Sequence, residues 1–139
     1  MGKKLQKAKR PKQVRRVFIA YPMREETQDV YSMVVDYFKL RSRRTSVDWQ
    51  IDSLEVHLPA TRELFAGVRD AIRGCDLGVV IAHQLSYNVA FELGLLVAWN
   101  KDIIVLVPRP SLHEVQHKFS DIAGLLFTSY NPHHITEIG

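Results

Sequence analysis

The residue best placed to do chemistry in this sequence is Glu92, the only charged residue between His83 and Lys101. An unpaired carboxylate among apolar side chains is costly, and such a group usually shifts its pKa or serves a site. A plainer interpretation is that Glu92 lies near the start of a helix and interacts favourably with the positive end of the helix dipole. The residue types leave both interpretations open. The apolar neighbours are Val89, Phe91, Leu93, Leu95, Leu96, Val97 and Trp99.

A carboxylate beside a ribose can stabilise a positively charged C1′ centre or attack it, as in glycoside cleavage. We expect the helix dipole to lower the pKa of Glu92 and to keep the group ionised, as this role requires. Neither glycine-rich phosphate motif, G-x-G-x-x-G or G-x-x-x-x-G-K-S/T, occurs, which argues against kinases and Rossmann hydride transfer. Helix N-terminal amides, Ser86 and Arg24 would instead hold a phosphate.

From Arg16 onward short β-like runs alternate with helical runs, which predicts parallel βαβ units in one α/β domain of three layers. We expect about five mostly parallel strands with helices on both faces. The predicted strands are 17–21, 47–56, 77–82, 103–107 and 125–128, and the predicted helices are 25–41, 61–74, 88–100 and 111–119. The helix at 88–100 is apolar all round, which predicts that it is buried, with Asn88 as its N-cap.

Ligands of an open parallel sheet bind outside the carboxyl ends of its strands. Glu92 lies one helical turn after Asn88, so we expect its carboxylate to point back toward this edge. We therefore predict Glu92 as a catalytic residue and the polar or exposed residues that follow the strands as substrate-binding residues. These are Tyr21, Pro22, Met23 and Arg24 after the first strand, His83, Ser86 and Asn88 after the third, and Arg109 after the fourth.

Other polar residues give weaker signals. His113 and His117 have the spacing of a metal pair, but no third ligand is evident, so we expect surface histidines and neither a metal nor a cofactor. Asp76 is expected to cap or pair across the turn before the third strand. Asp52 falls in the least clear strand, and the sequence assigns it no role.

Charge is distributed unevenly along the 139 residues. Residues 1–16 hold eight of the 19 Lys and Arg side chains and no acid, which leaves 11 basic and 15 acidic residues elsewhere. We expect a basic flexible tail at 1–15 and a domain at 16–139, with any nucleic-acid contact made through the tail. The sequence lacks an apolar span and a signal peptide, and Cys75 is its single cysteine, so we predict a soluble cytoplasmic protein without a membrane partner.

Three segments carry a family resemblance: VFIAYP at 17–22, AIRGCDLGVVIAH at 71–83 and NVAFELGLLVAWNKDIIVLV at 88–107. They resemble the nucleoside 2-deoxyribosyltransferase-like group and the related Toll/interleukin-receptor-like (TIR-like) nucleotide-binding domains of bacteria. The resemblance implies a flavodoxin-like sheet, a homo-oligomer and chemistry at an N-glycosidic bond. It places the family's catalytic glutamate on Glu92, its sugar and base loop on 21–24, and its polar residue before the catalytic helix on Ser86 or Asn88.

One segment departs from the transferases and monophosphate hydrolases of that group. Those enzymes usually carry an acid in the loop before the catalytic helix, whereas 83–88 reads HQLSYN and has no carboxylate. The Asn88-Val89 pair that opens the third segment is closer to the TIR-like branch. Some members of that branch cleave NAD in defence against phage, and others only bind nucleotides. We therefore predict cleavage or transfer at the N-glycosidic bond of a nucleotide or nucleoside, with NAD among the substrates considered. The alternatives are a non-catalytic nucleotide sensor or signalling module, and a nucleic-acid-associated protein that binds through its tail.

Overall fold

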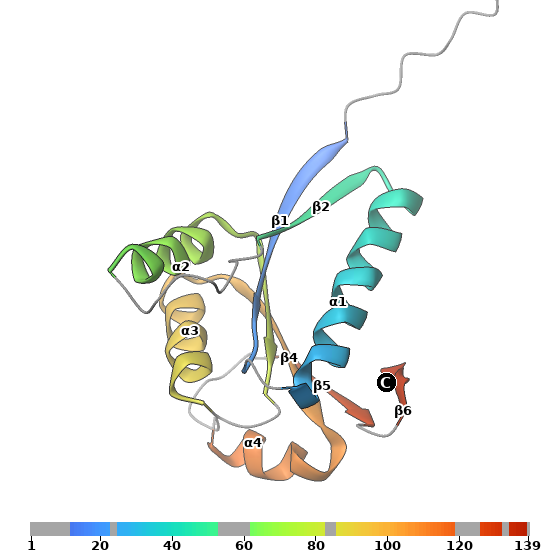
Figure 1. The fold of residues 1–139 in the computed structure, drawn as a ribbon, viewed down its shortest axis with the longest axis vertical. Helices are drawn as coiled ribbons and strands as arrows, with labels where there is room; N and C mark the ends of the chain where they lie inside the picture. The colour runs from blue at the N-terminus through green and yellow to red at the C-terminus, as the bar shows by residue number, and fades with distance from the viewer. Residues whose placement is uncertain are drawn as a thin grey trace, which may run out of the picture.

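The computed structural model describes residues 12–22, 25–52, 62–82, 86–118, 126–131 and 134–138. Strands and helices alternate along most of these segments, as the sequence predicts (Figure 1). The elements are β1 (Gln13–Ala20), α1 (Glu25–Arg44), β2 (Val47–Asp52), α2 (Arg62–Gly74), β3 (Leu77–Ile81), α3 (Tyr87–Ala98), β4 (Asp102–Pro108), the 3₁₀ turn η1 (Arg109–Ser111), α4 (Leu112–Lys118), β5 (Leu126–Asn131) and β6 (His134–Ile138).

The strands form one six-stranded sheet in the order β2-β1-β3-β4-β5-β6. β1 to β5 are parallel, and β6 pairs antiparallel with β5. The order of the five parallel strands is that of flavodoxin-like sheets, in which the order of strand addition reverses between β1 and β3. The predicted three-layer α/β fold is therefore confirmed. β6 was not predicted, because its sequence HITEI is a short polar alternation that lacks a continuous apolar run. β1 begins at Gln13, inside the stretch expected to be a tail.

Each face of the sheet carries its own apolar cluster. Alternate side chains of β1 divide between them: Phe18 and Ala20 face the helices α2, α3 and α4, whereas Val17 and Ile19 face α1. Burial of both faces accounts for the continuous apolar runs of the central strands. The first cluster also holds Ile72, Cys75, Val80, Ala82, Val89, Leu93, Leu96, Val105, Val107 and Val115, and the second holds Val30, Val34, Phe38, Val79, Ile81, Leu106 and Tyr130.

Only one side of α3 is buried, so the prediction of a helix buried all round is wrong. Val89, Leu93 and Leu96 pack on the sheet, whereas Tyr87 is 96% exposed and Phe91 43% exposed. α3 lies in an outer layer with the sheet beneath it and α2 beside it. Its remaining side therefore faces outward although it carries no charge. The lack of charge on the outward side of α3 therefore does not indicate that this side is buried.

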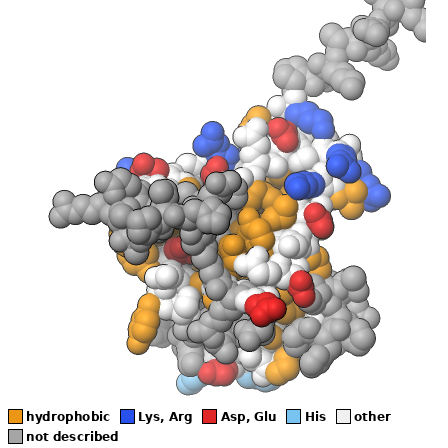
Figure 2. Space-filling view, in the orientation of Figure 1, with side chains coloured by type: hydrophobic (Ala, Val, Ile, Leu, Met, Phe, Trp, Pro, Cys, Tyr) orange, Lys and Arg blue, Asp and Glu red, His pale blue; other side chains and the backbone are white. Residues whose placement is uncertain are grey.

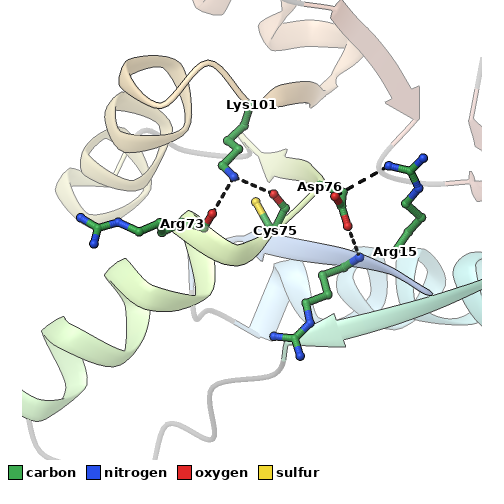
Figure 3. Close-up of polar contacts among 6 residues, drawn as sticks. Arg15, Arg73, Cys75, Asp76 and Lys101 are labelled. Carbon is green, nitrogen blue, oxygen red and sulfur yellow. Dashed lines mark hydrogen bonds and ion pairs between the residues drawn. The ribbon is translucent and has the colours of Figure 1, made fainter. Parts of the chain in front are cut away.

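Polar contacts tie the amino edge of the sheet together (Figure 3). Lys101 Nζ donates hydrogen bonds to the carbonyls of Arg73, at 2.6 Å, and Cys75, at 2.9 Å. Asp76 Oδ2 accepts a hydrogen bond from the backbone N–H of Arg16 at 2.9 Å, and its Oδ1 lies 3.8 Å from Arg15 Nη1. Asp76 therefore binds the neighbouring strand β1, and the expected pairing across the turn before β3 is wrong.

His113 and His117, which the sequence analysis expects at the surface, are both exposed on α4. Among the described residues, no three His, Cys, Asp or Glu side chains cluster in a way that would hold a metal ion. No helix in the described ranges combines the length and apolarity needed to cross a bilayer.

Candidate functional site

The carboxyl ends of the parallel strands define the candidate site. Tyr21 follows β1, Ser86 comes just before α3 on the connection from β3, and Arg109 follows β4. Because these strands run in one direction, all three residues come to the same edge of the sheet, at the bottom of Figure 1, where α1 and α3 begin. The order reversal beside β1 lies within this edge, where open α/β sheets bind ligands.

Glu92 occupies the second turn of α3 and turns inward. It lies three residues after buried Val89 and four before buried Leu96, and its own side chain is half-buried. Burial raises the pKa of Glu92 to about 7. The expectation of a dipole-lowered pKa is therefore wrong, because the dipole acts mainly within the first turn and desolvation outweighs it here. Within the described ranges, no hydrogen bond or ion pair reaches this carboxylate.

Two contacts between helices show which side of α3 carries Glu92. Phe91 packs against Phe65 of α2 with ring centroids 5.0 Å apart, and the Arg73 guanidinium of α2 lies 4.9 Å from the ring centre of Trp99. Trp99 is seven residues, or two turns, after Glu92 and shares its stripe of the helix. Glu92 therefore lies along the line where α2, α3 and the sheet meet.

Ser86, and not Asn88, caps α3. Ser86 has an extended backbone, with φ −80° and ψ 152°, and its Oγ accepts a hydrogen bond from Val89 N at 3.2 Å. Asn88 is already the second residue of the helix and is exposed, so the predicted N-cap is wrong by two residues. The Ser86 hydroxyl uses its oxygen for the cap, and its O–H remains a donor that can turn toward a ligand.

The end of β1 is fixed on the α1 side of the sheet. The Tyr21 ring stacks on Tyr31 with centroids 4.3 Å apart and an interplanar angle of 26°. Pro22 is buried, and its carbonyl accepts a hydrogen bond from the buried Thr27 hydroxyl. Tyr21 thus packs on the face of the sheet opposite to the one that α3 and Glu92 cover, although both residues lie near the carboxyl edge. Sequence reasoning missed Thr27 and Tyr31; their positions in the first two turns of the helix after β1 were the available signal.

Asp52 is a second acid to which the sequence assigned no role. It ends β2, pairs in register with Phe18, and follows Ile51, which packs on the α1 side. Alternation therefore turns Asp52 toward the side of the sheet that α3 covers. Its Oδ2 is buried and has no hydrogen-bond partner in the described part of the chain. Such an oxygen marks either strain or a site.

The other predicted binding residues divide into two groups. Arg109 is exposed in η1 beyond β4, and Asn88 is exposed at the start of α3. Met23, Arg24 and His83 lie outside the described residues. The structure thus brings Tyr21, Ser86, Asn88 and Arg109 to one edge and places Glu92 one turn inside α3.

Comparison with known proteins gives the fold a name. No family model matches the chain, and no curated protein matches it. Among solved structures, 37 chains match. One is the CMP N-glycosidase BcmB of Clostridium botulinum, with a TM-score of 0.64 and 20% identity, covering 84% of this chain and 89% of that one. Another is a 2-desoxiribosyltransferase from Leishmania mexicana, with a TM-score of 0.51 and 19% identity, covering 76% of this chain and 71% of that one. The protein therefore has a nucleoside 2-deoxyribosyltransferase-like fold.

Proposed function

We propose that this protein cleaves or transfers the N-glycosidic bond of a nucleotide or nucleoside, with Glu92 as its catalytic carboxylate. The observation that carries the proposal is the half-buried, unpaired state of Glu92 on the helix that starts at the ligand edge. Two solved structures that share the fold are named for a CMP N-glycosidase and a 2-desoxiribosyltransferase, which supports the same class of reaction.

The raised pKa of Glu92 suits this chemistry. A desolvated carboxylate is destabilised while its surroundings are neutral, and it is stabilised when positive charge develops beside it. Departure of the base breaks the C1′–N bond, the electron pair leaves with the base nitrogen, and the sugar becomes an oxocarbenium-like cation. Ionised Glu92 would stabilise this cation or form a bond to C1′, after which water or a second base takes its place.

Substrate contacts in this proposal come from residues at the carboxyl edge. The Ser86 hydroxyl and the Asn88 amide would bond the sugar, and Arg109 and Arg24 would hold a phosphate. Tyr21, Pro22, Met23 and His83 would line the base or sugar. Asp52 joins this set as a carboxylate that could accept hydrogen bonds from sugar hydroxyls, since its buried oxygen has no partner within the described ranges. NAD remains in the substrate set because the TIR-like resemblance implies it.

The test is base release from defined substrates. The full chain is incubated with CMP, dCMP, a deoxynucleoside with a free acceptor base, and NAD, and free base is separated by chromatography. We expect release from at least one substrate and its loss in Glu92→Gln. An active Glu92→Gln variant would remove the residue assignment.

A nucleotide sensor is the second candidate function, favoured by the absence of a carboxylate in 83–88. A sensor would bind nucleotide, as measured by calorimetry, and release no base from any of the substrates. Binding that Glu92→Gln leaves unchanged, with no turnover, would favour the sensor over the enzyme.

We also propose that the protein is a homo-oligomer. The outward side of α3 supports this proposal, because Tyr87, Phe91 and Val97 are exposed there and neighbouring Ala90, Gly94 and Ala98 add no charge. Uncharged helix faces can pack against each other without burying an unpaired charge. Sedimentation at increasing concentration tests the proposal, and a charge placed at Phe91 should shift the equilibrium toward the monomer.

A further inference from the structure

Basic side chains gather at the amino edge of the sheet, the end of the molecule opposite the proposed site. Figure 2 shows Lys and Arg side chains together over the end of α1 and the start of β2. Residues 12–16 and 39–50 hold seven Lys or Arg residues and one acid, Asp48. We call this the basic surface and define it by Lys12, Arg16, Arg41, Arg43 and Arg44.

Two hydrogen bonds join the start of β1 to the end of α1 and the turn that follows it in this surface. Lys12 Nζ donates a hydrogen bond to the Ser42 carbonyl, and Gln13 N donates one to the Ser46 carbonyl at 3.1 Å. The basic residues of the first strand and of the helix end therefore lie next to each other at one corner of the molecule. The chain enters this corner at Lys12, so the five basic residues of 1–11 are joined to it covalently.

Helix capping does not account for the three arginines. The Arg41 carbonyl at the end of α1 accepts hydrogen bonds from Thr45 N at 3.0 Å and from Thr45 Oγ1 at 2.7 Å. The Ser42 carbonyl accepts a hydrogen bond from Lys12 Nζ. Arg41, Arg43 and Arg44 are exposed, and in the described part of the chain their guanidinium groups have no hydrogen-bond or ion-pair partner. They gain at most the general attraction of the helix dipole.

Tyr37 adds an aromatic group to the margin of this surface. It is 53% exposed and precedes Arg41 by one turn and Arg44 by two on the same side of α1. About 10 Å of helix separates Tyr37 from Arg44. An exposed ring beside planar guanidinium groups is the arrangement that binds a flexible polyanion with aromatic bases, since arginine pairs with phosphate in bidentate fashion and the ring stacks on a base.

We propose that the basic surface binds single-stranded nucleic acid, with phosphates on Arg41, Arg43 and Arg44 and a base on Tyr37. This binding is separate from the proposed reaction, because the surface lies at the amino edge and Glu92 belongs to the carboxyl side. A phosphodiester strand also matches the excess of arginine over lysine among the described residues of the surface, since the guanidinium fork fits phosphate geometry.

The experiment measures anisotropy of a 5′-fluorescein 20-nucleotide oligouridylate with the full chain in 50 to 200 mM salt. Replacing Arg41, Arg43 and Arg44 together by Gln should weaken binding about tenfold or more and lower the slope of log affinity against log salt by about 2. The same positions changed to Lys should keep most of the slope. Arg69→Gln, an exposed arginine on α2, is the matched control and should bind like wild type.

Tyr37→Ala, a duplex and lipid vesicles together test whether the basic surface prefers single-stranded nucleic acid. Tyr37→Ala should lose about fivefold for the single strand and little for a 20-base-pair duplex. Circular dichroism confirms that each variant is folded. The proposal is overturned if the triple Gln variant binds like wild type, if Tyr37→Ala affects strand and duplex equally, or if the protein prefers phosphatidylserine vesicles to the oligonucleotide. Base release from mononucleotides should be unchanged in all these variants, which keeps this result independent of the proposed enzyme.

Discussion

Leu96 of α3 lies directly over Gly78 of β3, and the space between them admits no further atom. A Cβ on Gly78 would lie 2.6 Å from Leu96 Cδ1 and 2.7 Å from Leu96 Cδ2. Leu96 is fully buried, so its side chain cannot turn aside without displacing the core. The glycine therefore lets α3 approach the sheet closely. Glu92 lies one turn before Leu96 on the same helix, so this close approach also determines how deeply Glu92 is buried.

Gly78→Ala should lower the free energy of unfolding by about 1–3 kcal/mol, because the added methyl overpacks the α3 contact. Urea denaturation measures the loss. Leu96→Ala removes the clashing atoms and has its own cavity cost, so the double variant should be less destabilised than the two single losses together. Strict additivity would show that the two residues are not coupled.

The stability of the protein should depend on pH through Glu92. Its folded pKa of about 7 lies above the reference value of 4.5, so the folded chain holds this proton more tightly than the unfolded chain. Stability from this group is complete below pH 4.5, falls as the pH rises toward 7, and is constant above that. Over this window the loss is about 3 kcal/mol at the most.

Glu92→Gln keeps the position neutral at every pH and should remove this fall. At pH 8 the variant should then be more stable than wild type, by up to about 3 kcal/mol, in urea unfolding followed by fluorescence. Asp70→Asn, an exposed carboxylate on α2, is the matched control. Parallel pH curves for wild type and Glu92→Gln would mean that this carboxyl is not desolvated.

The same group predicts the pH dependence of activity. If ionised Glu92 meets the C1′ cation, kcat/KM should rise with pH and reach half its maximum near pH 7, the pKa of the free enzyme. A rate that falls through the same range would assign Glu92 the role of a general acid that protonates the base. Glu92→Gln should release no base at any pH in this range, because no carboxyl group remains at this position.

Ser86 should separate a capping role from a substrate role. Ser86→Ala removes the acceptor for Val89 N and should cost about 1 kcal/mol of stability. Ser86→Asp retains the cap and should restore that stability, yet its carboxylate cannot donate to a sugar or phosphate. We expect KM to rise in both variants if Ser86 binds substrate, and in neither if it only caps α3.

The fold followed from sequence patterns that are local and repeated. The apolar runs of β3 and β4 and the periodicity of α1 fixed the type and order of these elements, because burial on two faces or one leaves a clear pattern. β6 gave no such signal. The N-cap was misplaced because Ser86 and Asn88 are equally good capping residues, and only the backbone conformation at Ser86 decides between them.

The placement of the proposed site residues at strand ends could be predicted from the sequence, but the electrostatics of Glu92 could not. Strand ends place Ser86 and Arg109 at one edge whatever the packing, since parallel strands share a direction. The pKa of Glu92 depends on how far desolvation outweighs the dipole, which the sequence does not encode locally. The side of β1 on which Tyr21 packs depends on Tyr31, and the unpaired oxygen of Asp52 depends on the register with Phe18.

Lys101 tests whether the amino edge can be weakened without affecting the site. Its ammonium holds the Arg73 and Cys75 carbonyls at the end of α2, and Lys101→Met keeps the aliphatic stem while removing both hydrogen bonds. The free energy of unfolding should fall by about 1–2 kcal/mol, since this edge is partly open to water, which replaces some of the lost bonding. Because Glu92 belongs to the carboxyl side, the pH midpoint of base release should stay near 7. A shift of that midpoint in Lys101→Met would show that the depth of α3, and with it the burial of Glu92, depends on contacts at the opposite edge of the sheet.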